Sequence, residues 1–158
     1  MLMHDLYCQA RIKPAVNQIE VHPFYVRDSL VNYCLSRNIA VTAHTPLGGG
    51  QLNSQTWKAA APMDSEEIKA ISEAKGKSTA QVILRWLLQR RIIVIPKSMS
   101  PERIATNLAV YDFELSAEEM KTISGLDRYQ SAKTNPNPLS HFLEGADCFE
   151  AAGTDIFD

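Results

Sequence analysis

Short apolar stretches alternate with longer stretches of helical periodicity along this chain. Segments rich in apolar and β-branched residues, bounded by proline, glycine or polar residues, predict strands at residues 15–21, 39–43 and 92–95. The intervening segments predict helices, and strands that alternate with helices pair in parallel through right-handed crossovers. The pattern therefore predicts an α/β fold, which could be a small open sheet or part of a barrel.

The helices are predicted from their caps and from the spacing of their apolar residues. The clearest begins with Ser78 and Gln81 as a capping box and continues with apolar residues at helical spacing on one face, namely Ala80, Ile83, Leu84, Leu87 and Leu88. Gly76 separates it from a preceding helix, for which Asp64 and Glu67 are the predicted cap pair. Further helices are predicted at residues 2–10, 28–37, 101–110 and 116–126, and Ser116 with Glu119 is the predicted cap pair of the last.

The amino-acid composition excludes several classes of protein function. The chain has 158 residues, 45% of them hydrophobic, which is enough for one sizeable core. Its 16 basic and 18 acidic residues give a net charge of −2, which argues against a nucleic-acid or membrane-surface binder. The widely spaced Cys8, Cys34 and Cys148 suggest neither a disulfide framework nor a metal site. Without a signal peptide or an apolar run of membrane-spanning length, the expected location is the cytoplasm.

Polar residues that suit a phosphate group follow the third predicted strand. Pro96 ends the strand, and Ser100 with Pro101 forms the predicted start of a helix. Lys97 and Arg103 therefore lie at the carboxyl end of a strand, beside a helix N-terminus, where phosphate oxygens are favoured by charge and by backbone N–H groups. The same residues also fit a solvated basic loop.

Three stretches, taken in order, resemble the aldo-keto reductase family. They lie at residues 13–23, 42–48 and 95–107, and the resemblance covers residues 12–128. It implies a (β/α)₈ TIM barrel, of which the three strands look like the sixth to eighth. We therefore expect residues 1–128 to be the carboxyl-terminal half of an NADP-dependent oxidoreductase barrel domain, and residues 129–158 to be a variable carboxyl-terminal tail. Alone, such a partial barrel would be poorly soluble or would pair with another copy, because strand edges and apolar surface stay bare.

The resemblance implies an NADPH/NADP site. Gln18 is similar to the family's contact to the nicotinamide carboxamide, and His44 stands where the family commonly stacks a tyrosine on the nicotinamide. Thr45 and Leu47 are similar to the family's contacts to the pyrophosphate. The residues similar to its contacts to the 2′-phosphate are Lys97, Ser98 and Arg103, and Asn107 is similar to its contact to the adenine. A bidentate Arg beside a Lys favours NADPH over NADH. Glu20 and His22 are interpreted as structural.

No catalytic residue is predicted in this chain. The family's tyrosine, lysine, aspartate and histidine come from earlier strands, and none of the chain's tyrosines lies in a matching context. The expected function is an NADPH-dependent reduction of aldehydes or ketones by the intact protein, with sugar or sugar-phosphate carbonyls suggested weakly by the tail around Thr134 to Pro136.

We expect the intact protein to be a monomer or a weak dimer. Trp57 is read as a packing anchor or as a cover over the ligand. Two alternatives stay open: a non-catalytic NADP-binding or interaction module derived from such an enzyme, and an unrelated α/β binding protein.

Overall fold

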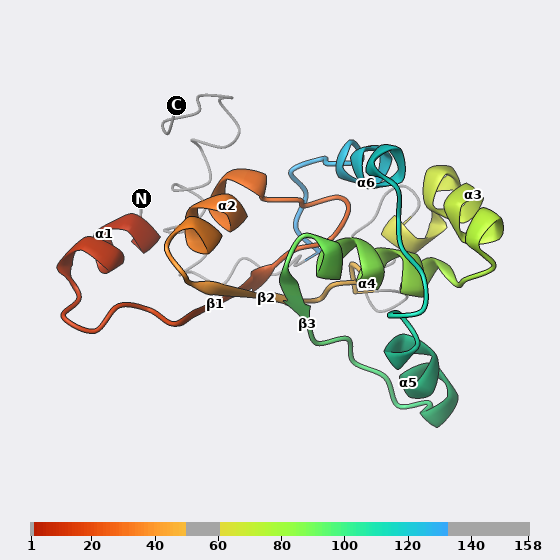
Figure 1. Ribbon diagram of the computed structural model, residues 1–158, viewed down its shortest axis with the longest axis horizontal. Helices are drawn as coiled ribbons and strands as arrows, with labels where there is room; N and C mark the ends of the chain where they lie inside the picture. Colours follow the sequence, from red (N-terminus) through yellow and green to blue (C-terminus); the bar gives the residue numbers. More distant parts are fainter. Residues whose placement is uncertain (1, 50–60, 133–158) are drawn as a thin grey trace.

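The computed structural model describes residues 2–49 and 61–132 of the chain. Trp57 and the tail from residue 133 lie outside the described residues. The elements in chain order are α1 (Leu2–Gln9), β1 (Val16–Glu20), α2 (Asp28–Ser36), β2 (Ala40–His44), the 3₁₀ helix η2 (Pro62–Asp64), α3 (Glu66–Lys75), α4 (Thr79–Gln89), β3 (Ile92–Val94), α5 (Pro101–Leu108) and α6 (Ala117–Ser124) (Figure 1).

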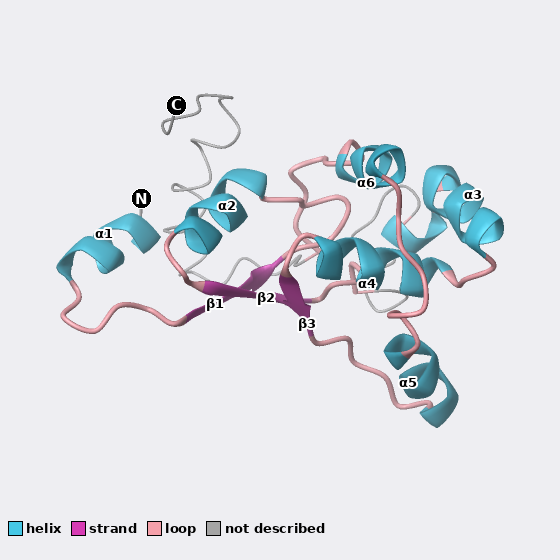
Figure 2. Cartoon of the chain, in the orientation of Figure 1, coloured by secondary structure: helices cyan, strands magenta, loops and turns pink. Residues whose placement is uncertain are grey.

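The three strands form one parallel sheet in the order β1-β2-β3, as the alternation of strands and helices predicts (Figure 2). Gln18 lies opposite Thr42, and Thr42 lies opposite Ile93, so these side chains share one face of the sheet. The helices connecting the strands cover the other face. Because all strands run the same way, their carboxyl ends meet at one edge.

The core lies between the sheet and the helices. Val41, Ala43 and Ile92 are almost fully buried there together with Trp86, whose indole N–H donates a hydrogen bond to the Ser124 hydroxyl (3.1 Å). The burial of Trp86 agrees with its prediction as a core residue. Val82 is buried although it is not on the predicted apolar side, and Ala80 and Leu88, which are on that side, are only half-buried. The reason is that α4 contacts β3 as well as the flanking helices α3 and α5.

Most predicted caps are confirmed, and one is wrong. Ser78 and Gln81 form a capping box, as do Ser116 and Glu119, and Ser100 accepts from the backbone N–H of Arg103. The cap of α3 is Ser65, whose hydroxyl accepts from the Ile68 N–H (3.3 Å), and not Asp64. Pro62 starts a 3₁₀ turn that includes Asp64, so the α-helix begins one residue later than predicted.

One side of this fold is open within the described residues. The face of the sheet that the connecting helices leave uncovered carries the exposed side chains of Val16, Gln18 and Ile93. In addition, β1 and β3 each pair along only one edge. Parallel sheets are almost always covered on both faces. None of the described helices is long and apolar enough to cross a membrane.

Candidate functional site

The carboxyl ends of β1 and β2 lie side by side, because Glu20 is the register partner of His44. On the same face, two residues earlier, Gln18 is exposed and lies opposite Thr42. Gln18 is therefore the third residue of β1 and not its last, and its amide lies on the open face of the sheet. Gln18 and His44 therefore lie near each other, on the open face of the sheet close to the carboxyl ends of its strands.

A tight turn follows β2. The half-buried His44 has its Nδ1 3.1 Å from the Thr45 hydroxyl oxygen, and Thr45 has a positive φ of 54°. The Gly48 N–H donates to the Thr45 carbonyl (2.9 Å) and closes the turn. The half-buried Leu47 packs against the core, so its backbone is the part that can face a ligand.

Gly48 is required by both its conformation and its surroundings. Its φ is +73°, and a Cβ at this position would lie 2.6 Å from Cγ of Pro62 in η2. Gly76 has a similar φ of +62°, but a Cβ there would meet nothing within 4 Å. Comparing alanine substitutions at the two positions therefore separates the cost in stability of the backbone conformation from the cost of close packing.

We expect Gly48→Ala to lower the free energy of unfolding by about 3 kcal/mol, because it adds a clash of roughly 1–3 kcal/mol to the positive-φ penalty of roughly 1–2 kcal/mol. Gly76→Ala is the matched control and should carry only the penalty for positive φ. Urea unfolding of both variants measures the difference. Equal losses would show that Pro62 does not constrain the turn.

The segment after β3 carries two cationic side chains that are available to a ligand. Lys97 and Arg103 are exposed, and neither forms an ion pair within residues 2–49 and 61–132. By contrast, several other basic side chains form ion pairs with acidic residues, namely Lys69, Lys75, Lys77, Arg85 and Arg90. Two exposed cations without a carboxylate partner, near the first turn of α5, favour an anionic ligand.

Local hydrogen bonds shape this segment. The Ser98 hydroxyl accepts from the Ser100 N–H (3.2 Å), and the Ser100 hydroxyl accepts from the Arg103 N–H (3.3 Å). These bonds set the path from β3 into α5, with Pro101 as the first helical residue. The half-buried Asn107 follows Arg103 by one helical turn and lies on the same side of α5.

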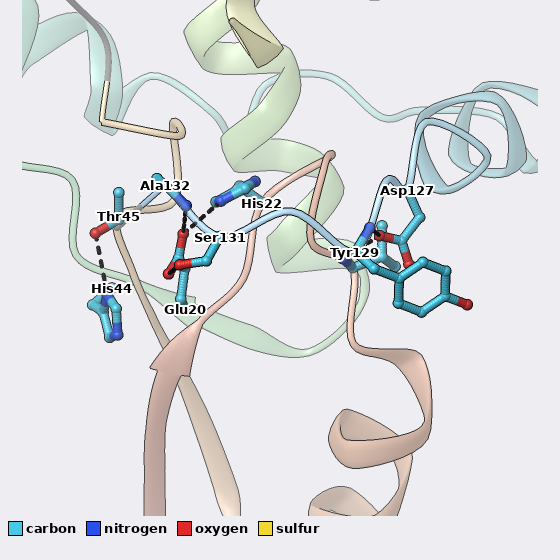
Figure 3. Close-up of polar contacts among 9 residues, drawn as sticks. Glu20, His22, His44, Thr45, Asp127, Tyr129, Ser131 and Ala132 are labelled. Atoms are coloured by element: carbon cyan, nitrogen blue, oxygen red, sulfur yellow. Dashed lines mark hydrogen bonds and ion pairs between the residues drawn. The ribbon is translucent and has the colours of Figure 1, made fainter. Parts of the chain in front are cut away.

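Glu20, the last residue of β1, takes part in several hydrogen bonds. Its Oε1 lies 2.8 Å from Nε2 of His22 and also accepts from the Ala132 N–H, while its Oε2 accepts from the Ser131 hydroxyl (2.7 Å) (Figure 3). Burial raises the pKa of this carboxyl, but the hydrogen bonds from His22, Ser131 and Ala132 outweigh it and lower the pKa to about 2. The structural interpretation of Glu20 and His22 is thereby confirmed.

Residues 127–132 are held against the loop after β1, and the sequence analysis did not anticipate this contact. The Phe24 carbonyl accepts from the N–H groups of Arg128 (3.2 Å) and Gln130 (3.0 Å), and Asp127 Oδ1 accepts from the Val26 N–H (3.3 Å). We call residues 127–132 the carboxyl clasp. The signal that could have indicated it is Glu20 itself, because an acid in a strand that is otherwise half-buried needs donors from elsewhere.

A sequence model described as the aldo/keto reductase family matches residues 2–128. The chain belongs to the aldo/keto reductase family. The resemblance seen in the sequence is thus confirmed, and the parallel sheet with its helices is the corresponding α/β arrangement. The ligand-facing residues predicted from the sequence are Gln18 in β1, His44 at the end of β2, and residues in the segments that follow β2 and β3.

Curated relatives of the family are considerably longer than this chain. The NADP-dependent D-sorbitol-6-phosphate dehydrogenase of Malus domestica is 43% identical over 127 residues, which cover 80% of this chain and 41% of that protein. The aldo-keto reductase family 1 member A1-A of Danio rerio is 43% identical over 124 residues, covering 78% and 38%. The chain therefore spans about two-fifths of the length of these relatives.

Solved structures of the family show the same arrangement. A Bombyx mori aldo-keto reductase in complex with NADP superposes with a TM-score of 0.76 at 32% identity, covering 87% of this chain and 45% of that one. A second aldo-keto reductase, complexed with NADPH, superposes with a TM-score of 0.77 at 31% identity, covering 83% and 40%. The fold of the described residues is therefore that of part of an aldo-keto reductase TIM barrel.

Proposed function

We propose that this chain is the cofactor-binding, carboxyl-terminal half of an NADPH-dependent aldo-keto reductase. In this proposal β1, β2 and β3 are the sixth, seventh and eighth strands of the barrel. The observation that carries it is the pair Lys97 and Arg103, both exposed and without a carboxylate partner in the described chain, at the carboxyl edge of a parallel sheet. Ligands bind at this edge in α/β proteins, and an anionic group suits these two cations.

The residues present fit a phosphorylated dinucleotide. Lys97, Ser98 and Arg103 would hold the 2′-phosphate, because Arg offers a planar fork, Lys a point charge and Ser a neutral donor. Asn107, half-buried one turn beyond Arg103, would contact the adenine. The turn after β2 would approach the pyrophosphate through its backbone, since Leu47 directs its side chain to the core.

The other end of the dinucleotide would lie near the open face of the sheet. The exposed amide of Gln18 would hydrogen-bond the carboxamide, and the imidazole of His44 would stack on the nicotinamide ring. When bound, NADPH supplies a hydride to an aldehyde or ketone carbon. This chain's residues bind and orient it, and the acid that protonates the carbonyl oxygen would come from earlier strands of the intact protein.

The proposed cofactor preference is tested by titrating the chain with NADPH and NADH separately and following the fluorescence of the reduced nicotinamide. We expect NADPH to bind more tightly by a factor of about ten or more, because a charge-assisted hydrogen bond contributes about 1.5–3 kcal/mol. Equal affinities, or no binding by a chain whose circular dichroism shows it to be folded, would overturn the proposal.

The rival function is a non-catalytic NADP-binding or interaction module. The observation that keeps it open is that the chain spans only about two-fifths of its curated relatives. Reading the coding sequence upstream of Met1 separates the two: in-frame motifs for the catalytic tyrosine, lysine, aspartate and histidine support the enzyme. A stop codon preceded by a functional promoter supports the module.

The proposed substrates of the intact protein are small-molecule carbonyls, with sugars or sugar phosphates as the first candidates. The support is the relative from Malus domestica, which is named a D-sorbitol-6-phosphate dehydrogenase. The tail residues that suggested the same class lie outside the described part of the chain. A cytoplasmic location and a monomeric or weakly dimeric state of the intact protein stay predictions.

A further inference from the structure

The carboxyl clasp covers the loop that follows β1. Phe24 in this loop is fully buried, Ala132 in the clasp is 1% exposed, and the Arg128 guanidinium lies 3.8 Å from the centroid of the Phe24 ring. The clasp also donates two backbone hydrogen bonds to the Phe24 carbonyl and two hydrogen bonds to the Glu20 carboxylate. Because all these contacts belong to one short segment, they form and break together, and the clasp is either docked or released.

The buried pair Phe24 and Ala132 also contacts the segment that packs on the turn after β2. Ala61 packs against this pair, and Pro62 follows it as the buried first residue of η2. The Pro62 ring lies so close to Gly48 that a Cβ on Gly48 would be 2.6 Å from the proline Cγ. The turn is therefore braced by Pro62, and Pro62 follows a residue that packs where the docked clasp packs.

A second connection runs through the strand ends. Glu20 is the register partner of His44, which directly precedes the turn. Figure 3 shows the two residues at the ends of neighbouring strands, with Ala132 beside the Glu20 carboxylate. Glu20 is 5% exposed, and both of its carboxylate oxygens are bonded within the protein. It can therefore act on a ligand only through the clasp and the turn.

We propose that docking of the carboxyl clasp holds the turn after β2 in the conformation that binds the pyrophosphate of the dinucleotide, and that Glu20 is a positioning residue for this contact. The inference rests on the proposed function, which assigns the pyrophosphate to this turn. Docking of the clasp and binding of the dinucleotide then favour each other by the same factor, because the coupling free energy between two sites is reciprocal.

A loss of stability on changing Glu20 does not distinguish this role from a purely structural one. The distinguishing property is which ligands respond. NADPH contains the pyrophosphate, whereas adenosine 2′-monophosphate carries only the adenine, the ribose and the 2′-phosphate. In the proposed function this smaller ligand contacts the segment after β3 and α5, so its binding does not depend on the turn after β2.

The test measures the affinity of the full chain for both ligands by isothermal titration calorimetry, at a temperature where circular dichroism shows every variant to be folded. We expect Glu20→Gln to weaken NADPH binding by about tenfold and to leave the affinity for adenosine 2′-monophosphate within about twofold of wild type. Ser131→Ala removes one hydrogen bond to the carboxylate and should weaken NADPH binding by a smaller factor. Glu114→Gln, at an 82% exposed carboxylate, is the matched control and should change neither affinity.

Hydrogen exchange in the wild-type chain tests the reciprocal effect without any substitution. The N–H groups of Gln130 and Ala132 are bonded when the clasp is docked, so they exchange when it is released. Saturating NADPH should slow their exchange by about tenfold, and saturating adenosine 2′-monophosphate should leave it unchanged. This measurement decides the question even if Glu20→Gln fails to fold.

Three results would overturn the positioning role. In the first, limited proteolysis after residue 132 shows that Glu20→Gln releases the clasp, yet the variant binds NADPH as tightly as wild type does. In the second, the two ligands lose affinity equally, which indicates a general loosening of the fold. In the third, NADPH binds the wild-type chain without slowing exchange in the clasp. NADPH still binds the wild-type chain in all three cases, so the proposed function stands, whereas a folded wild-type chain that binds neither ligand would remove both.

Discussion

Replacing Arg103 with alanine is expected to weaken NADPH binding by between about tenfold and about a hundredfold, while NADH affinity stays unchanged. The physical reason is that a charge-assisted contact to a phosphate contributes about 1.5–3 kcal/mol, and only NADPH carries the 2′-phosphate. Arg103 is exposed and forms no ion pair within the described chain, so its loss leaves no acidic partner stranded. Fluorescence titration of the variant with each cofactor measures the change.

Arg11→Ala controls for the general loss of one positive charge. Arg11 is also exposed, but it lies in the segment before β1, well away in sequence from the segment after β3. The control should leave both affinities as they are, apart from a small effect that added salt removes. An Arg103 variant that keeps the full preference for NADPH would contradict the assignment of the 2′-phosphate to this segment.

Replacing Glu20 with glutamine is expected to lower the free energy of unfolding at neutral pH by roughly 3 kcal/mol, in the range for leaving buried donors without their charged acceptor. A glutamine has one acceptor oxygen where the carboxylate has two, and its N–H₂ group would face either the Ser131 hydroxyl, which bonds Oε2, or the Ala132 N–H, which bonds Oε1. It would also remove the charge that faces His22. Urea unfolding followed by circular dichroism measures the loss, and limited proteolysis after residue 132 reports the release of the carboxyl clasp.

The same carboxylate predicts a dependence of stability on acid. The pKa of Glu20 is about 2 in the folded chain, against a reference value of 4.5. A lowered pKa contributes stability that is fully present above about pH 4.5 and is lost as the pH falls towards 2, because protonation then becomes favourable in both states. The wild-type chain should lose about 3 kcal/mol over this interval through Glu20 alone, and the glutamine variant should lack that part of the loss.

Glu114→Gln is the matched control for Glu20. Glu114 also pairs with a cation, Arg85 (3.1 Å), but its side chain is 82% exposed. An exposed pair contributes at most about 1 kcal/mol, so this variant should stay close to wild type. If both variants lose the same small amount of stability, the hydrogen bonds of Glu20 do not hold the carboxyl clasp.

Much of the architecture is determined by local signals in the sequence. The predicted strands lie where the structure has β1, β2 and β3, and the Ser78, Ser100 and Ser116 caps are confirmed. These signals succeed because capping joins residues three positions apart, and apolar periodicity is set by the geometry of one element. The family followed from short motifs in a fixed order, and the match over residues 2–128 confirms it.

One wrong prediction is local, and the others depend on contacts between distant parts of the chain. The α3 cap moved from Asp64 to Ser65 because the turn begun by Pro62 extends one residue further than the sequence indicates. The burial of Val82 depends on several elements that surround α4, and periodicity reports only one apolar side. The assignment of cofactor contacts, from Gln18 to Asn107, stays a prediction because it depends on a ligand.

The sequence by itself determined the order of the strands and α-helices, the family, and the position of Lys97 and Arg103 after β3. Only the tertiary structure decided that Glu20 binds a segment more than a hundred residues away, and that no described residue covers the apolar side of α5. The physical reason is the same in both cases. The local sequence shows which polar and apolar side chains need a partner in the folded state. Which residues become those partners depends on how distant segments pack, and nothing in the neighbouring sequence encodes it.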